Sequence, residues 1–302
     1  MPLRLGVLLV STGQQAGRLV MVDMAHLAED LGFESVWVDD GLAAPDVGAG
    51  GGRRVFEPLV TLSYLAASTT RLRLGISSLL LPLREPVLVA RQVAALDALS
   101  GGRTLLAVDA GSSEAEFAAL GQDFNNRYER LEEELYVVRA LWQGGVEISY
   151  PGKYYHFEGV YFSPTPVQPG GTPLWIGGSS QAALQRAARL GDGWQPGALS
   201  PQALSRALAS IRLQLGERPF TVSLRLGVAL DAADASQADL AGSTQEVASQ
   251  LHALWLAGMN HAVLCFYEEY LPARLRAMRR FQGEVLPAFE SICQSFPRPA
   301  VR

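Results

Sequence analysis

The sequence of 302 residues contains very little lysine, histidine or cysteine. Its one lysine, Lys153, stands against 24 arginines and falls in an expected turn, which disfavours a Schiff-base enzyme. Four histidines are present, and none has a partner at ligand spacing, so we expect no metal centre. Cys265 and Cys293 lie far apart in the chain and predict neither a disulfide framework nor a metal knuckle.

The chain also lacks an excess of positive charge and any long apolar run. A net charge of −5 argues against a nucleic-acid partner. No apolar stretch is long enough to cross a bilayer, so we expect no membrane association. Residues 3–10 have no basic leader and read as a first strand rather than a signal peptide, which favours a cytoplasmic protein. A hydrophobic content of 48% indicates a large core.

Apolar strand-like runs alternate with amphipathic helical runs along the whole chain. This alternation predicts an α/β fold, a (β/α)8 TIM barrel formed by residues 1–302 as one domain. An open doubly wound sheet is the competing fold, but it offers no reason for eight steady units. The expected strands are 4–10, 35–38, 72–80, 104–108, 174–176, 192–195, 220–229 and 262–266, and the helices are 19–31, 58–68, 86–99, 127–142, 181–190, 201–215, 244–257 and 273–289.

Two segments interrupt this alternation. Residues 41–57 are rich in glycine and predict a long flexible loop after the second strand. Residues 144–171 predict an inserted β-hairpin between the fourth helix and the fifth strand. Its expected strands, 146–150 and 154–157, flank a Pro-Gly-Lys turn at 151–153.

The most informative segment follows the fifth expected strand. Residues 174–176 run into Gly177 and Gly178, and then Ser179 and Ser180 open a helix. Glycines allow a ligand to approach the backbone, and the start of a helix attracts an anion, so we expect a phosphate at this turn. An ordinary strand-to-helix turn is the structural alternative.

Other polar residues cluster where the expected strands end, which is where barrel active sites form. Any one of these acids could instead be a helix cap or a solvated loop residue. With no metal site, no suitable lysine and no catalytic triad, the chemistry points to an organic cofactor. The residues are Asp39, Asp40, Ser77, Ser78, Asp109, Ser112, Ser113, Trp194, Tyr267, Glu268 and Glu269.

Several motifs, in their order and spacing, resemble the bacterial luciferase-like monooxygenase superfamily, particularly its deazaflavin-dependent branch. The resemblance covers nearly the whole chain. The motifs are residues 28–38 (AEDLGFESVWV), 57–58, 66–75 (AASTTRLRLG), 96–103 (LDALSGGR), Phe117 with 120–121, Arg127 with 130–133, 166–169 (PVQP) and 173–194.

The resemblance implies a flavin or deazaflavin across the carboxyl-terminal mouth of a barrel. It places the cofactor phosphate at residues 177–180. It also implies that the third strand ends in a bulge with a non-prolyl cis peptide between Ser77 and Ser78, behind the ring. Cofactor contacts are further expected from Gly111, Ser112 and Trp194, the last as a pocket wall or as a buried structural residue.

The chain departs from the family pattern at three positions. Gly41 stands near the place where relatives commonly carry a histidine after the second strand. Asp109 replaces a glycine of the usual turn after the fourth strand, and a carboxylate there repels a phosphate. Ser112 stands where many relatives carry tryptophan or glutamate.

Together these observations favour an oxidoreductase that transfers a hydride between coenzyme F420, or else FMN, and a small organic substrate. With FMN the enzyme could be a monooxygenase. Asp40 and Asp109 are the candidates for acid–base or substrate contacts. A barrel that has lost catalysis and now binds a cofactor or serves structure is the alternative, and a phosphate-binding barrel without a redox cofactor is a third. The resemblance also implies a homodimer.

Overall fold

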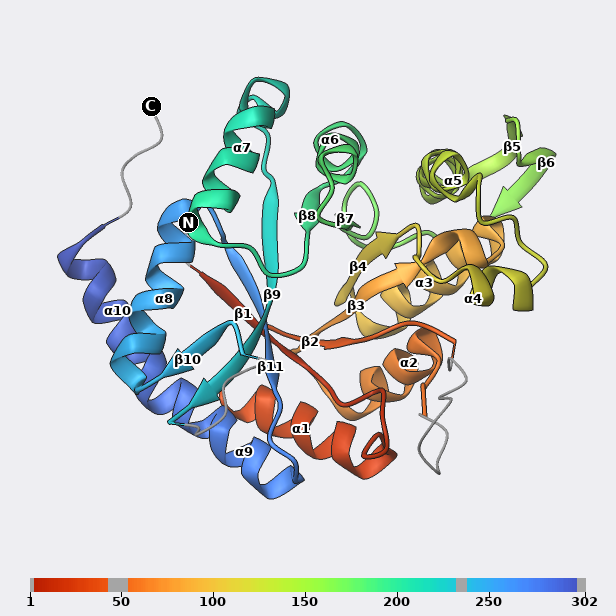
Figure 1. Cartoon of the computed structure of the whole chain (residues 1–302). Helices are drawn as coiled ribbons and strands as arrows, with labels where there is room; N and C mark the ends of the chain where they lie inside the picture. The colour runs from red at the N-terminus through yellow and green to blue at the C-terminus, as the bar shows by residue number, and fades with distance from the viewer. Residues whose placement is uncertain (1–2, 43–53, 232–237, 298–302) are drawn as a thin grey trace.

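Eight parallel strands close into a barrel in the computed structural model, which describes residues 3–42, 54–231 and 238–297 (Figure 1). Each strand pairs in parallel with its neighbour, and the pairing of the sixth with the seventh completes the ring. The predicted TIM barrel is confirmed. Its strands are β1 (Arg4–Leu8), β2 (Ser35–Val38), β3 (Arg73–Leu80), β4 (Thr104–Asp109), β7 (Leu174–Gly177), β8 (Gly193–Gln195), β9 (Thr221–Leu230) and β11 (His261–Phe266).

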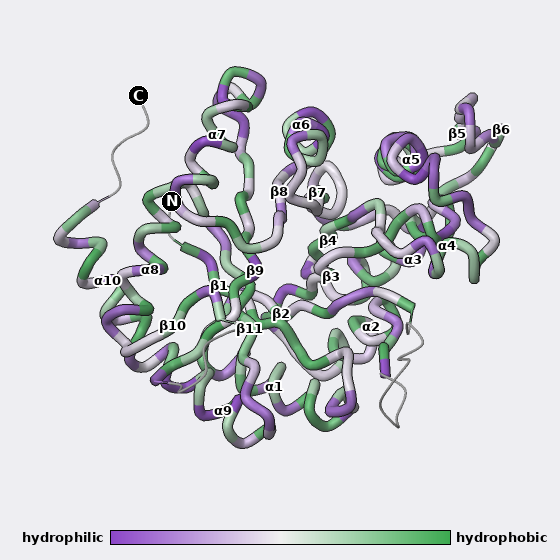
Figure 2. Tube along the Cα trace, in the orientation of Figure 1, coloured by the Kyte–Doolittle hydropathy of each residue, from purple (hydrophilic) through white to green (hydrophobic). Residues whose placement is uncertain are grey.

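Helices cover the outside of the barrel between successive strands. They bury their apolar faces against the strands, and Figure 2 shows hydrophobic stretches along the central strands with hydrophilic stretches mostly on the outer helices. Proline in the first turn starts α2, α3 and α7, where its missing N–H has no cost. The main helices are α1 (Arg18–Asp30), α2 (Pro58–Ser68), α3 (Pro86–Ser100), α5 (Arg127–Trp142), α6 (Gln181–Leu190), α7 (Pro201–Leu215), α8 (Thr244–Ala257), α9 (Leu271–Arg280) and α10 (Leu286–Ser295).

Large rings fill the interior of the barrel. Trp37 on β2 stacks on Trp175 on β7 with ring centroids 5.1 Å apart, and His261 on β11 packs edge-on against both. Gly75 on β3 makes room for this layer, because a Cβ there would lie 2.3 Å from the Trp37 ring. The interior is therefore a packed core and not a pore.

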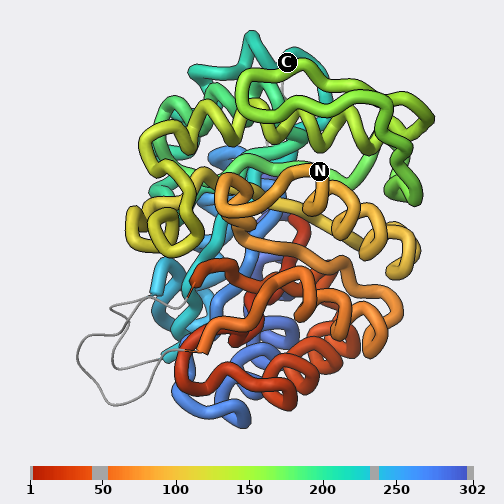
Figure 3. The backbone as a smooth tube through the Cα atoms, turned by 90° about the vertical axis from the view of Figure 1, so that its right-hand side faces the viewer, coloured from red at the N-terminus to blue at the C-terminus, as the bar shows by residue number. Residues whose placement is uncertain are grey.

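The predicted hairpin insertion is confirmed. Strands β5 (Gly145–Pro151) and β6 (His156–Phe162) pair antiparallel and lie beside α5, outside the barrel (Figures 1 and 3). Glu133 on α5 anchors the turn by accepting hydrogen bonds from the backbone N–H groups of Tyr154, at 2.9 Å, and Tyr155, at 2.8 Å.

Several elements differ from the sequence expectations. A short helix, α4 (Glu114–Ala119), follows β4 and is capped by Ser113; it is too short to show a helical period. The helix expected over 273–289 is interrupted by a π-helical turn, Phe281–Val285, between α9 and α10. A short strand, β10 (Leu240–Gly242), adds to β9. Residues 43–53 of the expected flexible loop lie outside the described residues.

Within the described ranges, no helix combines the length and apolar character needed to span a bilayer.

Candidate functional site

Two irregular backbone segments lie at the carboxyl-terminal ends of nearby strands. The register of β3 against β4 shifts between Ile76 and Leu79, and the Ser77–Ser78 peptide bond is cis. The expected bulge and cis peptide are both confirmed. Only β4 separates β3 from β7, which continues into the turn at residues 177–180. The bulge and the turn therefore face the same side of the mouth.

The inner side of this turn is filled by protein side chains. A Cβ on Gly177 would lie 2.7 Å from Ser78 Oγ and 2.8 Å from Asp109 Oδ2. Internal packing therefore also favours glycine at 177, and the expectation that it serves the approach of a ligand stays a prediction. The tertiary structure does bring Ser78, Asp109 and Gly177 together, as a site on these residues requires. It also sets a carboxylate directly beneath the turn.

The outer side of the turn is exposed. Gly178 has a φ of +95°, which favours glycine regardless of any ligand. Ser180 caps α6 by accepting a hydrogen bond from the Ala183 N–H at 3.1 Å, and Ser179 Oγ accepts one from the Gly197 N–H at 3.1 Å. Both serines are exposed, and the first turn of a helix leaves backbone N–H groups without helical partners. Ser179 and Ser180 are therefore the part of this turn that is open to solvent.

Trp194 supports this turn from behind. Its side chain is 1% exposed, and its Nε1–H donates to the Gly178 carbonyl at 2.9 Å. Of the two roles expected for Trp194, the geometry favours the structural one, because a ring with almost no exposed surface has no face for a ligand.

The remaining expected contacts lie after β4. Gly111 has a φ of +81°, and its N–H donates to Asp109 Oδ1 at 3.3 Å. The Gly111 carbonyl accepts a hydrogen bond from Arg127 Nε at 3.2 Å, so the Arg127 guanidinium lies beside the segment that follows β4. Ser112 is exposed beside it. Arg127 belongs to one of the motifs named above, but no place at the site was predicted for it.

Asp40 is held as part of the protein framework. Its side chain is 2% exposed and forms a two-pronged ion pair with Arg84, at 2.6 Å and 2.8 Å. The backbone N–H groups of Leu80 and Gly41 also donate to it, each at 2.8 Å. Four donors on two oxygens favour a positioning role that ties the end of β2 to the end of β3, so the expected part of Asp40 in proton transfer has no support in this geometry.

A cavity of about 300 Å³ opens at the mouth between β1, β2 and β9. Arg225 lines it and forms an ion pair with Asp39, with Nη1 and Oδ1 2.5 Å apart. Burial lowers the pKa of Arg225, but Asp39, Cys265 and Tyr267 outweigh burial and the net pKa is raised. Arg225 was not predicted from the sequence, although it is the one charged residue of β9.

Glu116 closes the other side of this cavity. It lies on α4, and its Oε1 accepts a hydrogen bond from the Leu42 N–H at 2.6 Å. Burial raises the pKa of nearby Tyr267 to about 12, so its hydroxyl stays protonated at neutral pH. The walls of the mouth cavity therefore include three carboxylates (Asp39, Asp40 and Glu116), the Arg225 guanidinium and the Thr12 hydroxyl.

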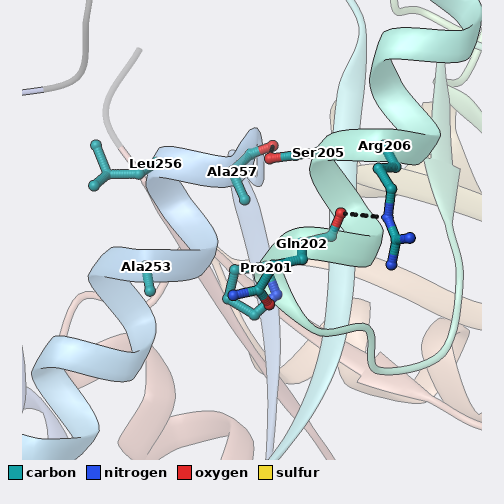
Figure 4. Close-up of a pocket in the computed structure, with 7 residues that line it drawn as sticks. All are labelled: Pro201, Gln202, Ser205, Arg206, Ala253, Leu256 and Ala257. Atoms are coloured by element: carbon teal, nitrogen blue, oxygen red, sulfur yellow. Dashed lines mark hydrogen bonds between the residues drawn. The ribbon is translucent and has the colours of Figure 1, made fainter.

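Another hollow, of about 470 Å³, lies on the outer surface between α7 and α8 (Figure 4). Its walls are helix residues far from the strand ends, among them Gln202, Arg206 and Leu256. It contains none of the expected site residues. Across the described part of the chain, no group of histidine, cysteine and acidic residues is arranged to hold a metal ion.

The fold and the polar mouth define a (β/α)8 barrel whose candidate site uses the ends of β2, β3, β4, β7 and β9. The luciferase-like monooxygenase family model matches residues 6–289, and the chain belongs to this family.

Relatives of the chain include both deazaflavin and flavin enzymes. Uncharacterized protein Rv0940c of Mycobacterium tuberculosis is 33% identical over 204 residues, which is 63% of this chain and 69% of that protein. F420-dependent glucose-6-phosphate dehydrogenase of Gordonia bronchialis is 31% identical over 58% of this chain and 51% of its own length. FMNH2-dependent dimethylsulfone monooxygenase of Pseudomonas putida is 29% identical over 71% and 58%, respectively.

Among solved structures, an F420-dependent secondary alcohol dehydrogenase in complex with an F420–acetone adduct superposes with a TM-score of 0.81. The match covers 96% of this chain and 99% of that one at 16% identity, and it shows the shared fold.

Proposed function

We propose that this chain is an oxidoreductase that transfers a hydride between F420 and a small organic substrate, with FMN as the second cofactor candidate. One observation carries the proposal: the β3 bulge and the exposed start of α6 lie on either side of β4 at one mouth of the barrel. The relatives named above support both cofactors, and the motifs that resemble the deazaflavin branch favour F420.

The residues present fit such a group with one restriction. Because Ser78 and Asp109 fill the inner side of the turn, the phosphate is expected on the outer side, at Ser179 and Ser180. The positive end of the α6 dipole favours an anion there. The ring is then expected beside Ser77 and Ser78, over the end of β4.

When bound, F420 or FMN supplies the two-electron chemistry, and FMN adds the possibility of reaction with oxygen. The chain supplies orientation and a proton carrier. Asp109 is half-buried at the end of β4, and we assign Oδ2 as the atom that takes or gives the proton. The ion pair of Asp39 and Arg225 orients the substrate in the mouth cavity.

The first test compares two helix caps. Ser180→Ala and Ser200→Ala each remove a serine cap, on α6 and α7, with cap distances of 3.1 Å and 3.2 Å. Each costs about 1 kcal/mol of stability, but only Ser180 lies at the proposed phosphate position. In titrations of F420 and of FMN followed by absorbance, S180A is expected to bind at least tenfold more weakly, and S200A as wild type. Equal affinities in the two variants would refute the phosphate position.

The second test concerns Asp109. Asp109→Asn removes the negative charge beneath the turn while keeping the side-chain size, so the cofactor should bind more tightly. Loss of the proton carrier should lower the rate of substrate-dependent bleaching by about 100-fold or more. An unchanged rate would eliminate Asp109 as the carrier.

A barrel that has lost catalysis is the second candidate. The Asp109 carboxylate fills the inner side of the turn at residues 177–180, and Asp40 is fully paired with protein groups. If the purified wild-type protein retains neither F420 nor FMN at micromolar concentration, this alternative replaces the enzyme.

A further inference from the structure

A separate cavity lies at the opposite, amino-terminal end of the barrel. Its volume is about 450 Å³, and its walls come from the starts of β1, β3, β4, β7, β8 and β9. Three arginines line it: Arg4, Arg73 and Arg218. These residues come from widely separated parts of the sequence, so only the closed barrel brings them to one cavity.

Arg4 and Arg73 are only partly satisfied by protein groups. Each donates one short hydrogen bond, Arg4 to Thr221 Oγ1 at 2.9 Å and Arg73 to Gln168 Oε1 at 2.8 Å. Both guanidiniums face the same oxygen of Glu34, at 3.7 Å and 3.9 Å, which is beyond normal hydrogen-bond distance. One carboxylate is thus shared loosely by two cations.

The cavity has a positive balance of charge. Three arginines line it, against Asp192 in the wall and Glu34, which faces Arg4 and Arg73. The Oδ2 of Asp192 already accepts hydrogen bonds from Arg139 Nη2, at 2.7 Å, and from the Leu174 N–H, at 2.8 Å. Its negative charge is therefore directed to a partner outside the cavity wall.

Burial lowers the pKa of Arg73, and the charge of Arg4 lowers it further, although Glu34 opposes them. Burial therefore leaves the Arg73 charge poorly solvated, and a further anion beside it would stabilise this charge.

The rest of the wall combines buried apolar residues with a fixed guanidinium. Trp175 and Leu105, each 1% exposed, close the inner end of the cavity beside Pro173. Arg218 is fixed in place, since its Nη1 donates to the Gly191 carbonyl at 2.8 Å, and its other amino group donates to the carbonyls that end α6. A pre-positioned guanidinium loses little entropy on binding an oxyanion.

We propose that this amino-terminal cavity is a binding site for a compact organic oxyanion that carries two or more carboxylate or phosphate charges. Arg4 and Arg73 hold the anionic group, and Arg218 holds a second oxygen at the rim. The site is distinct from the mouth at the other end of the barrel, so it does not depend on the proposed redox function.

The test measures binding of two probes, inorganic phosphate and citrate, to the full-length protein by calorimetry and by thermal unfolding. Sodium chloride at matched ionic strength serves as the reference. The expected result is saturable binding, with a rise in the unfolding midpoint beyond that in chloride. Tighter binding of citrate would identify a carboxylate ligand, and tighter binding of phosphate a phosphorylated one. Absence of saturable binding by both probes would overturn the proposal.

Variants locate the site. Arg4→Gln with Arg73→Gln should weaken binding at least tenfold. The control Arg206→Gln removes one positive charge from α7, as each of the single variants Arg4→Gln and Arg73→Gln does, and should bind as wild type. Arg206 donates to the Gln202 carbonyl of its own helix (Figure 4). If the double variant does not fold, the two single variants replace it, and each should bind the probes about threefold more weakly than wild type. Unchanged affinity in both single variants would contradict the site. S180A should bind citrate as wild type does, which separates this site from the cofactor site.

Discussion

The buried imidazole of His261 makes the stability of this protein depend on pH in a way that can be isolated. His261 is fully buried, and its ring nitrogens lie 2.8 Å from Ser223 Oγ and 3.3 Å from Ser35 Oγ. Burial lowers its pKa to about 3, and the charges of Arg4 and Arg73 act in the same direction. The carboxylate of Glu34, 4.0 Å from Nε2, does not overcome them.

The sign and size follow from proton linkage. The unfolded chain, with a histidine pKa of about 6.5, binds a proton that the folded chain does not, so stability falls as pH falls below this value. At pH 5 the unfolded pKa is about 1.5 units above the pH, and each unit is worth about 1.4 kcal/mol. The His261 contribution to the free energy of unfolding therefore falls by about 2 kcal/mol between pH 7 and pH 5.

The assay is urea unfolding of wild type and His261→Gln at pH 7 and at pH 5. Glutamine does not titrate, and its amide can still bond the two serines. Other groups, including Glu134, whose pKa burial raises to about 8, contribute equally to both proteins and cancel in the difference. The stability of wild type relative to the variant should fall by about 2 kcal/mol on acidification. A change below about 0.5 kcal/mol would refute the neutral, buried imidazole.

Two further predictions test the barrel and the mouth. Gly75→Ala should lower the free energy of unfolding by about 2 kcal/mol or more in urea, because the added Cβ would lie 2.3 Å from the Trp37 ring. The control Gly283→Ala has open space around it and should leave the free energy of unfolding unchanged or raise it. Equal effects of the two substitutions would contradict the close packing at Gly75. Arg84→Gln leaves the buried Asp40 carboxylate without its cation and should cost about 3 kcal/mol by the same assay, with a loss under about 1 kcal/mol contradicting the framework role.

Local patterns in the sequence were enough to predict most of the elements. Apolar runs predicted the strands, and prolines at positions 58 and 86 predicted the starts of two helices. The structure confirms these elements. The inserted hairpin was predicted from its turn residues. The short helix α4 and the π-helical turn at 281–285 were not, because six residues are too few for a period and a π-turn leaves the apolar pattern almost unchanged.

The candidate site was predicted only in part. Residues 177–180, Ser77–Ser78 and Asp109 do meet at one mouth, as the alternation of parallel strands requires. Which way each side chain points was not accessible. Asp40 turns to Arg84, Trp194 lies behind the turn, and Asp109 packs under Gly177.

The sequence by itself determined the class of fold, because buried parallel strands must be apolar and helices must present an apolar face at a fixed period. Only the tertiary structure decided which charges meet. Arg225 forms an ion pair with Asp39, and Arg4 and Arg73 line the same cavity at the amino-terminal end of the barrel. These contacts depend on closure of the barrel, which brings together strands that are far apart in the sequence. Local residue patterns carry no information about which distant strands become neighbours.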